Sequence, residues 1–154
     1  MNFAYFDTSA LLKRYVTEAG SSWLRTYLAS PTAPVVFTSY LTAVEATCAF
    51  ARRLREGTLL PDDHTIVVQA FDYDIAHRYN LLDVMPATID TARRLANRHP
   101  LRAYDAVQLA TAWLLKQELL RGGDPPLTFI CADDRLNTVA QAEGLSTDNP
   151  NHYP

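Results

Sequence analysis

Cysteine is scarce in this chain of 154 residues, which contains two, Cys48 and Cys131. They lie far apart and form no C-x-x-C pattern, which excludes a disulfide framework, a cysteine-based zinc site and a thioredoxin-like redox motif. We expect both to be buried free thiols in a reducing cytosol. A hydrophobic core must therefore hold the fold together, and a chain of this length can bury one as a single domain.

The sequence also lacks an excess of positive charge and any long apolar run. Its formal net charge of -3 means that it does not coat nucleic acid through bulk charge. An RNA ligand would have to bind through a local basic patch or through bound cations. Asp7 interrupts the N-terminal segment too early for a signal peptide, and no apolar run reaches the ~20 residues of a membrane span. We therefore expect a cytoplasmic protein.

Short apolar segments alternate with helical ones along the whole chain. Strands are predicted at 3–6, 35–38, 79–84 and 127–131, and helices at 9–16, 21–28, 41–56, 61–77, 86–99, 102–120 and 135–143. This alternation predicts an α/β fold with a mainly parallel sheet that helices cover on both faces. We expect one domain over residues 1–146, followed by a loosely ordered C-terminal tail at 147–154.

Four acidic residues stand out by their position. Asp7 and Asp133 each come just after a predicted strand, and ligands of open α/β sheets bind outside the carboxyl ends of the strands. Asp105 opens the longest predicted helix. Glu45 lies on an apolar helical face, where a carboxylate is costly unless something pairs with it. Their joint placement favours a common site.

Each acid also has a purely structural alternative. Asp7 and Asp133 precede helices, where aspartate is a common N-cap. Glu45 follows Thr42 at the spacing of a capping box, and Asp105 would favourably meet the helix dipole. If the four converge, they raise each other's pKa, and a divalent cation relieves that repulsion. Hard oxygen ligands suit Mg²⁺ or Mn²⁺, and such a cation activates water for phosphodiester hydrolysis.

Four segments together resemble the PIN-domain nucleases. They match in the same order as in that family and span about residues 3 to 145: AYFDTSALLKRY at 4–15, TSYLTAVEATCAFAR at 38–52, LRAYDAVQLATA at 101–112 and TFICADDRLNTVAQAEGL at 128–145. A single-domain protein of this length is most similar to the VapC-type toxins of type II toxin–antitoxin systems. The resemblance implies a three-layer α/β/α PIN-like fold.

The same resemblance implies a function and a set of residue roles. A VapC-like chain is expected to be a homodimeric endoribonuclease, dependent on Mg²⁺ or Mn²⁺, with a cognate antitoxin that covers its active site. Carried over by motif, the catalytic acids are Asp7, Glu45, Asp105 and Asp133. The resemblance makes Asp7 and Asp105 the direct metal ligands, whereas Glu45 and Asp133 act through water or orient the nucleophile.

Three further residues are weaker candidates. Ser9 occupies the family's small hydroxyl position and would hold a water or a phosphate oxygen, although a first-turn structural role fits it equally well. Asp134 follows Asp133 directly and could share or take its role. Arg52 lies two turns after Glu45, on nearly the same side of the helix, and would contact phosphate, whereas the structural alternative is a solvated helix face.

Other functions remain open. A catalytically silent PIN-like module that binds RNA or protein would keep the fold without needing the acids, and a DNA nuclease could use the same site. A haloacid-dehalogenase-like phosphatase would require an aspartate where Ser9 stands. Dinucleotide binding is excluded, because no glycine-rich turn follows any predicted strand.

Overall fold

Strand β1 (Phe3–Phe6) forms the centre of a parallel sheet, and all four of its side chains are buried. The structure is a computed structural model that describes residues 1–153. Within that range the strand order is β3-β2-β1-β4-β5, and every neighbouring pair is parallel. The other strands are β2 (Val35–Ser39), β3 (Asn80–Leu82), β4 (Leu127–Ile130) and β5 (Ser146–Asp148). The predicted α/β class with a parallel sheet is confirmed.

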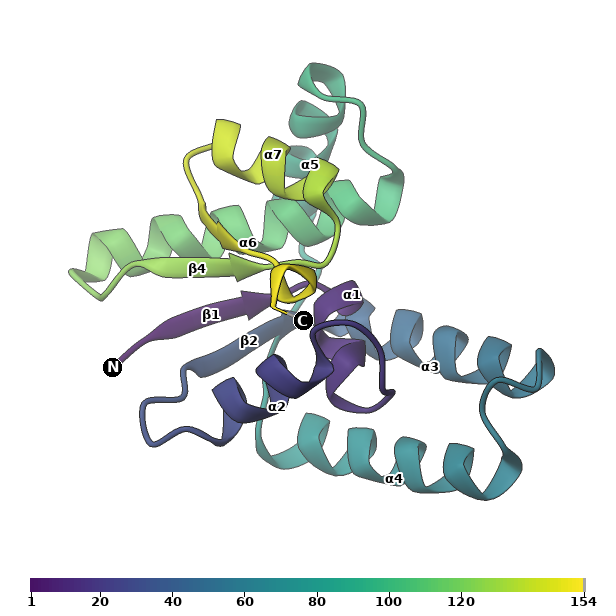
Figure 1. Cartoon of the computed structure of the whole chain (residues 1–154). Coiled ribbons are helices and arrows are strands. Elements are labelled where there is room, and N and C mark those ends of the chain that lie inside the picture. Colours follow the sequence, from purple (N-terminus) through teal and green to yellow (C-terminus); the bar gives the residue numbers. More distant parts are fainter. Residues whose placement is uncertain (154) are drawn as a thin grey trace.

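Helices connect the strands and cover both faces of the sheet (Figure 1). The α-helices are α1 (Thr8–Leu11), α2 (Ser21–Ala29), α3 (Tyr40–Arg55), α4 (Pro61–His77), α5 (Pro86–Arg98), α6 (Ala103–Gly122) and α7 (Asp134–Ala142). Two short 3₁₀ turns, η1 (Leu12–Arg14) and η2 (Pro150–His152), complete the helical elements within residues 1–153. The predicted helix at 9–16 is thus split, because the chain tightens into η1 after Leu11.

The alternating side chains of β1 divide the core into two clusters. Phe3 and Tyr5 pack with buried residues of α5, α6 and α7, whereas Ala4 and Phe6 pack with residues of α1 to α4. A strand that is apolar on both faces is typical of a sheet covered by helices on each side. The expected three-layer α/β/α arrangement follows from this alternation and is confirmed.

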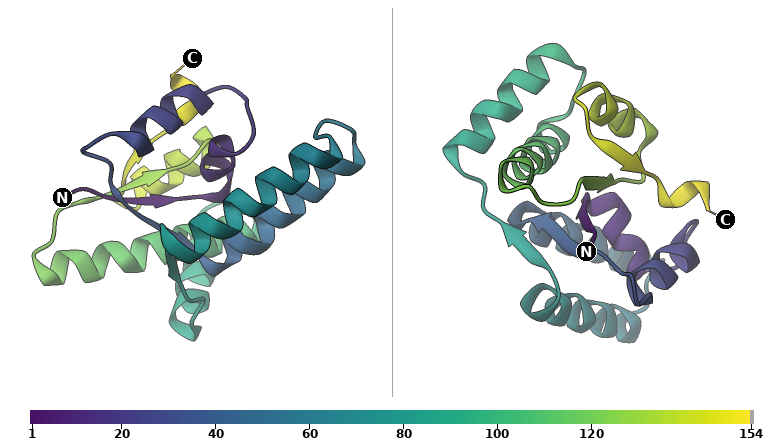
Figure 2. Two further views of the ribbon diagram at one scale, coloured as in Figure 1. Left: turned by 90° about the horizontal axis from the view of Figure 1, so that it is seen from below. Right: turned by 90° about the vertical axis from the view of Figure 1, so that its left-hand side faces the viewer.

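Helices α3 and α4 form an antiparallel pair that projects beyond the end of the sheet (Figures 1 and 2). Buried Asp74 anchors the last turn of α4. Its carboxylate accepts hydrogen bonds from Arg14 Nε at 2.8 Å and from the Tyr15 hydroxyl at 2.8 Å, and Arg78 Nε lies 3.2 Å away. None of the helices within residues 1–153 is both long and apolar enough to cross a membrane.

The C-terminal segment is packed onto the domain, in contrast to the loosely ordered tail expected at 147–154. Strand β5 pairs with β4, and the ring of Tyr153 stacks on Trp23 with the ring centroids 4.3 Å apart. Asn149 is buried and donates to Asp134. These partners come from distant parts of the chain, so the polar composition of the segment alone gave no sign of them. Pro154 lies outside the described residues.

Gly20 makes this packing possible and yields a first prediction. Its φ of +80° is a conformation that favours glycine, and a Cβ there would overlap the Pro150 carbonyl. Gly57 has a similar φ of +73°, but a Cβ there would meet nothing within 4 Å. We expect Gly20→Ala to lower the free energy of unfolding by about 3 kcal/mol and Gly57→Ala by about 1 kcal/mol, because only the first adds a clash to the backbone strain.

Urea unfolding of the two variants beside the wild type measures this difference. Equal losses would show that the C-terminal segment does not press against Gly20 in solution.

Candidate active site

Two of the predicted acids follow neighbouring strands and so leave the sheet at the same edge. Asp7 follows β1 and Asp133 follows β4, and parallel strands end at the same edge of a sheet. The Asp7 backbone N–H donates to the Ile130 carbonyl at 3.0 Å, which continues the ladder past the last residue of β1. Both aspartates also cap a helix, since their side chains accept from Ser9 N and Arg135 N respectively. The structural and functional interpretations of these acids are therefore compatible.

Asp7 is the most deeply buried of the four acids, with 6% of its surface exposed. Burial raises the pKa of its carboxyl to about 6, and repulsion from Glu45 and Asp105 adds to this effect. Hydrogen bonds from Ser9 oppose it: the hydroxyl donates to Asp7 Oδ2 at 2.5 Å and the backbone N–H at 3.1 Å. The carboxylates of Glu45 on α3 and Asp105 on α6 therefore lie close enough to Asp7 for their charges to affect its pKa.

Asp105 connects the fourth acid to this group. It lies in the first turn of α6 and is partly buried. Burial raises its pKa, repulsion from Asp133 raises it further, and Arg102 and Arg135 oppose the shift. The four acids predicted from the sequence thus interact electrostatically as an acidic series: Glu45 and Asp105 each repel Asp7, and Asp133 repels Asp105.

Two side-chain donors hold the Glu45 carboxylate, and both come from other elements. Its Oε1 accepts from the Thr8 hydroxyl at 2.9 Å and from Gln108 Nε2 at 2.7 Å. The capping-box alternative for Glu45 is wrong, because the N-cap of α3 is Ser39, whose hydroxyl accepts from the Leu41 N–H. Glu45 is instead directed from α3 towards α1 and α6.

Gln108 was missed by sequence reasoning although it organises this part of the site. It is fully buried, its Oε1 accepts from the Tyr5 hydroxyl at 2.5 Å, and its amide also reaches the hydroxyls of Thr8 and Thr42. A signal was present in the sequence: Gln108 is a polar residue in an apolar stretch, and it lies one helical turn after Asp105.

Ser9 links the segments that follow β1 and β4. Its hydroxyl oxygen accepts from the Ala132 N–H at 3.1 Å while the hydroxyl donates to Asp7, and Cys131 Sγ lies 3.6 Å away. Cys131 is buried as expected, but Cys48 is exposed. The expectation of a buried thiol at Cys48 was wrong, because Cys48 lies on a side of α3 that is open to solvent.

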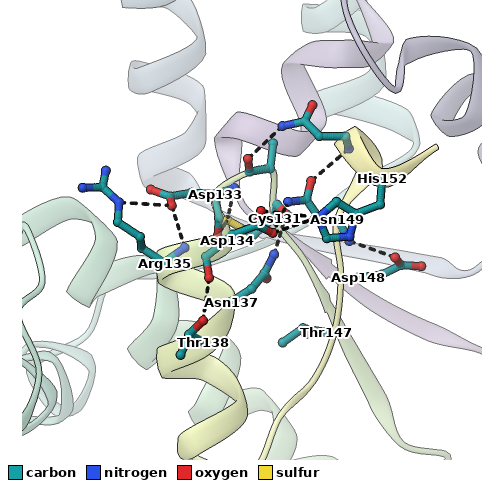
Figure 3. Close-up of polar contacts among 12 residues, drawn as sticks. Cys131, Asp133, Asp134, Arg135, Asn137, Thr138, Thr147, Asp148, Asn149 and His152 are labelled. Carbon is teal, nitrogen blue, oxygen red and sulfur yellow. Dashed lines mark hydrogen bonds and ion pairs between the residues drawn. The ribbon is translucent and has the colours of Figure 1, made fainter. Parts of the chain in front are cut away.

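Asp133 and Asp134 face different surroundings at the start of α7 (Figure 3). Asp133 lies beside Arg135, whereas Asp134 accepts from Asn149 Nδ2 at 2.6 Å and lies 3.1 Å from His152 Nε2. The hydrogen bonds from Asn149 and His152 lower the pKa of Asp134. Repulsion on Asp105 comes from Asp133, so Asp133 belongs to the acidic series and Asp134 to the C-terminal packing.

The donor set fits a hard divalent cation. No three His, Cys, Asp or Glu side chains in the described part of the chain are close enough to enclose one ion. Mg²⁺, however, keeps several waters and is usually bound through only one or two carboxylates. A buried carboxylate such as Asp7, whose pKa neighbouring acids raise, would gain most from a cation. Asp7 fits this requirement, and Asp105, which interacts with it electrostatically, is the second residue that the resemblance gives as a ligand.

Comparison with known families shows which family the chain belongs to. A family model described as the PIN domain matches residues 4–140. The chain belongs to the PIN-domain family. Two curated relatives from Mycobacterium tuberculosis, Ribonuclease VapC45 of strain CDC 1551 and Ribonuclease VapC49 of strain H37Rv, are each 32% identical over 147 residues. Each alignment covers 94% of this chain and 93% of the relative.

Solved structures share the PIN-domain fold at lower identity. A toxin–antitoxin complex from Klebsiella pneumoniae has a TM-score of 0.60 at 18% identity and covers 96% of this chain and 97% of its own. FitAcB from Neisseria gonorrhoeae has a TM-score of 0.65 at 16% identity, covering 97% and 99%. PAE2754 from Pyrobaculum aerophilum has a TM-score of 0.62 at 18% identity, covering 95% and 89%.

The raised pKa of Asp7 gives a prediction for this PIN domain in the absence of divalent cations. Because the folded pKa of about 6 exceeds the ordinary value of 3.8, the folded chain binds the proton more tightly. The stability that Asp7 contributes is then greatest below 3.8 and is lost as the pH rises through about 6. In EDTA, Asp7→Asn should raise the free energy of unfolding by about 1–3 kcal/mol near pH 7.5 and by much less near pH 4.

The measurement is urea unfolding as a function of pH, with Asp134→Asn as the matched control. The pKa of Asp134 is lowered, so its substitution should not stabilise the chain at neutral pH. The same pH dependence in Asp7→Asn and wild type would contradict the assignment of the raised pKa to Asp7.

Proposed function

We propose that this PIN-domain protein is an endoribonuclease that hydrolyses RNA phosphodiester bonds with the help of Mg²⁺ or Mn²⁺. The observation that carries the proposal is the series of four acids at one edge of the sheet, with buried Asp7 near its centre. The acid that follows β1, those on α3 and α6 and the one at the start of α7 interact electrostatically there, and helix capping accounts for Asp7 and Asp133 but not for Glu45. The 32% identity to two proteins named as ribonucleases supports RNA as the substrate.

Each residue then has a distinct task. Asp7 and Asp105 would hold the cation, and Ser9 fixes the orientation of the Asp7 carboxylate. Glu45, held by Thr8 and Gln108, accepts a proton from the attacking water, and Asp133 supports the site through bridging water. When bound, the cation neutralises charge on the phosphodiester and lowers the pKa of water.

We also propose the biological setting of this activity. The chain would act as a cytoplasmic toxin of a toxin–antitoxin pair, as a homodimer whose active site the cognate antitoxin covers. The support is the likeness to VapC relatives and to a fold found in a toxin–antitoxin complex. Mass measurement of the chain expressed alone and together with the gene next to it tests both the dimer and the partner.

Substitution of individual acids tests whether the protein is a nuclease or a catalytically silent RNA-binding module. We expect Asp7→Asn and Asp105→Asn to slow RNA cleavage by about 100-fold or more, because a cation supplies several kcal/mol to the transition state. Asp105→Asn should also weaken Mn²⁺ binding in calorimetry. The assay follows cleavage of a labelled single-stranded RNA with Mg²⁺, with Mn²⁺ and with EDTA, beside a DNA of the same sequence.

The two neighbouring aspartates provide a matched pair for the same assay. Asp133→Asn should lose activity, whereas Asp134→Asn should keep it, because Asp134 faces Asn149 and His152. Full activity in Asp7→Asn, or cleavage that persists in EDTA, would refute the proposed mechanism. Cleavage of the DNA but not of the RNA would refute the substrate.

A further inference from the structure

A hollow of about 390 Å³ opens beside Glu45 and continues along α3. One wall is the exposed side of α3, with Val44 and Cys48 followed by Arg52 and Arg55. The other wall is Tyr104, at the start of α6 and directly before Asp105. The hollow therefore begins at the acidic series and leads away from it along the projecting α3–α4 pair.

The apolar part of this groove is unusually open to solvent. Tyr104 is 63% exposed and Val44 is 61% exposed, although both are large hydrophobic side chains next to a polar site. Aromatic rings in such positions provide platforms on which unpaired bases stack, whatever the sequence. An exposed tyrosine beside a candidate catalytic acid is thus suited to holding a base next to the bond that is cut.

The far end of the groove is positively charged. Arg52 and Arg55 lie roughly 10 and 15 Å beyond Glu45 along the helix axis. Both are exposed, and neither makes an ion pair with any side chain of residues 1–153. Their guanidinium groups are therefore available for phosphate, and the spacing suits consecutive phosphates of an extended strand rather than a single anion.

Another hollow, of about 470 Å³, is less suited to this role. It is lined by Arg14, Arg25, Arg78 and Tyr73 among others, but Asp74 already binds Arg14 and Arg78. It contains none of the four acids. Of these two hollows, only the groove along α3 combines arginines without an ion pair among residues 1–153 and an exposed aromatic ring with direct continuity to the acidic series.

We infer that this groove binds the single-stranded RNA that flanks the cleaved bond, with one base stacked on Tyr104 and the phosphates that follow held by Arg52 and Arg55. The inference rests on the proposed ribonuclease function and adds the path of the substrate. It also makes the site selective for unpaired RNA, because the bases of a duplex are already stacked and cannot reach Tyr104.

Binding is measured in the Asp7→Asn background, so that the RNA stays intact. The probe is a fluorescein-labelled, unstructured RNA of ten nucleotides, followed by fluorescence anisotropy. Tyr104→Ala should weaken binding roughly tenfold, and Tyr104→Phe should restore it, since stacking needs the ring and not the hydroxyl. Replacing both Arg52 and Arg55 by Gln should weaken binding and lower the slope of log K against log salt by about 1.4, or ~0.7 per phosphate.

Matched controls come from exposed residues of the same types elsewhere. Tyr73 and Arg121 lie outside the groove, so Tyr73→Ala and Arg121→Gln should leave RNA affinity unchanged. In the otherwise wild-type chain, Tyr104→Ala should raise KM for the RNA while kcat is largely kept. Unchanged RNA affinity in Tyr104→Ala and in the double arginine variant would overturn the inference.

The same measurements also distinguish RNA from other possible occupants of the groove, and they test the two proposals independently. If Tyr104→Ala alters the dimer mass, or abolishes capture of a co-expressed partner protein, without changing RNA affinity, the groove is a protein interface and the inference fails. If cleavage depends on the metal but RNA affinity does not depend on the groove residues, the inferred RNA path is refuted and the proposed nuclease function stands. If RNA binding depends on Tyr104 but the wild-type chain never cuts RNA, the proposed nuclease function is refuted and the inferred RNA path stands.

Discussion

Burial of the Asp7 carboxylate at an edge of the sheet that it shares with other acids is the constraint on which the rest of this site depends. Asp7 is nearly buried, and burial and two acidic neighbours together raise its pKa to about 6. The fold offsets this cost locally, with two hydrogen bonds from Ser9 to Asp7 and two donors to Glu45. The polar residues around the acids therefore stabilise carboxylates at partly buried positions, where an unpaired charge would be costly.

The topology explains why acids so distant in sequence come together. Because β1 lies between β2 and β4, the segments that leave these three strands all begin at the same edge. Asp7 and Asp133 follow strands directly, and α3, which carries Glu45, starts at the end of β2. Helix α6 crosses the face of the sheet with its N-terminus near that edge, which brings Asp105 and Gln108 to the other acids.

Sequence patterns predicted the frame of this molecule well, because its strands are short and apolar and its helices begin at clear signals such as Pro61 and Pro86. The same patterns singled out Asp7 and Asp133 as residues after strands. They missed Gln108, whose partners lie on three other segments, and they misjudged the exposure of Cys48. The packed C-terminal segment was not foreseen either, since stacking of Tyr153 on Trp23 depends on where two distant segments meet.

The central position of β1 has a consequence for the order in which the protein can assemble. β1 is the first strand to be made, yet one of its two neighbours, β4, begins only at Leu127. During synthesis the N-terminal half can collapse early, but β4 and the Asp133 that follows it are absent until most of the chain has left the ribosome. A truncated or unfinished chain thus lacks the complete set of acids at this edge of the sheet.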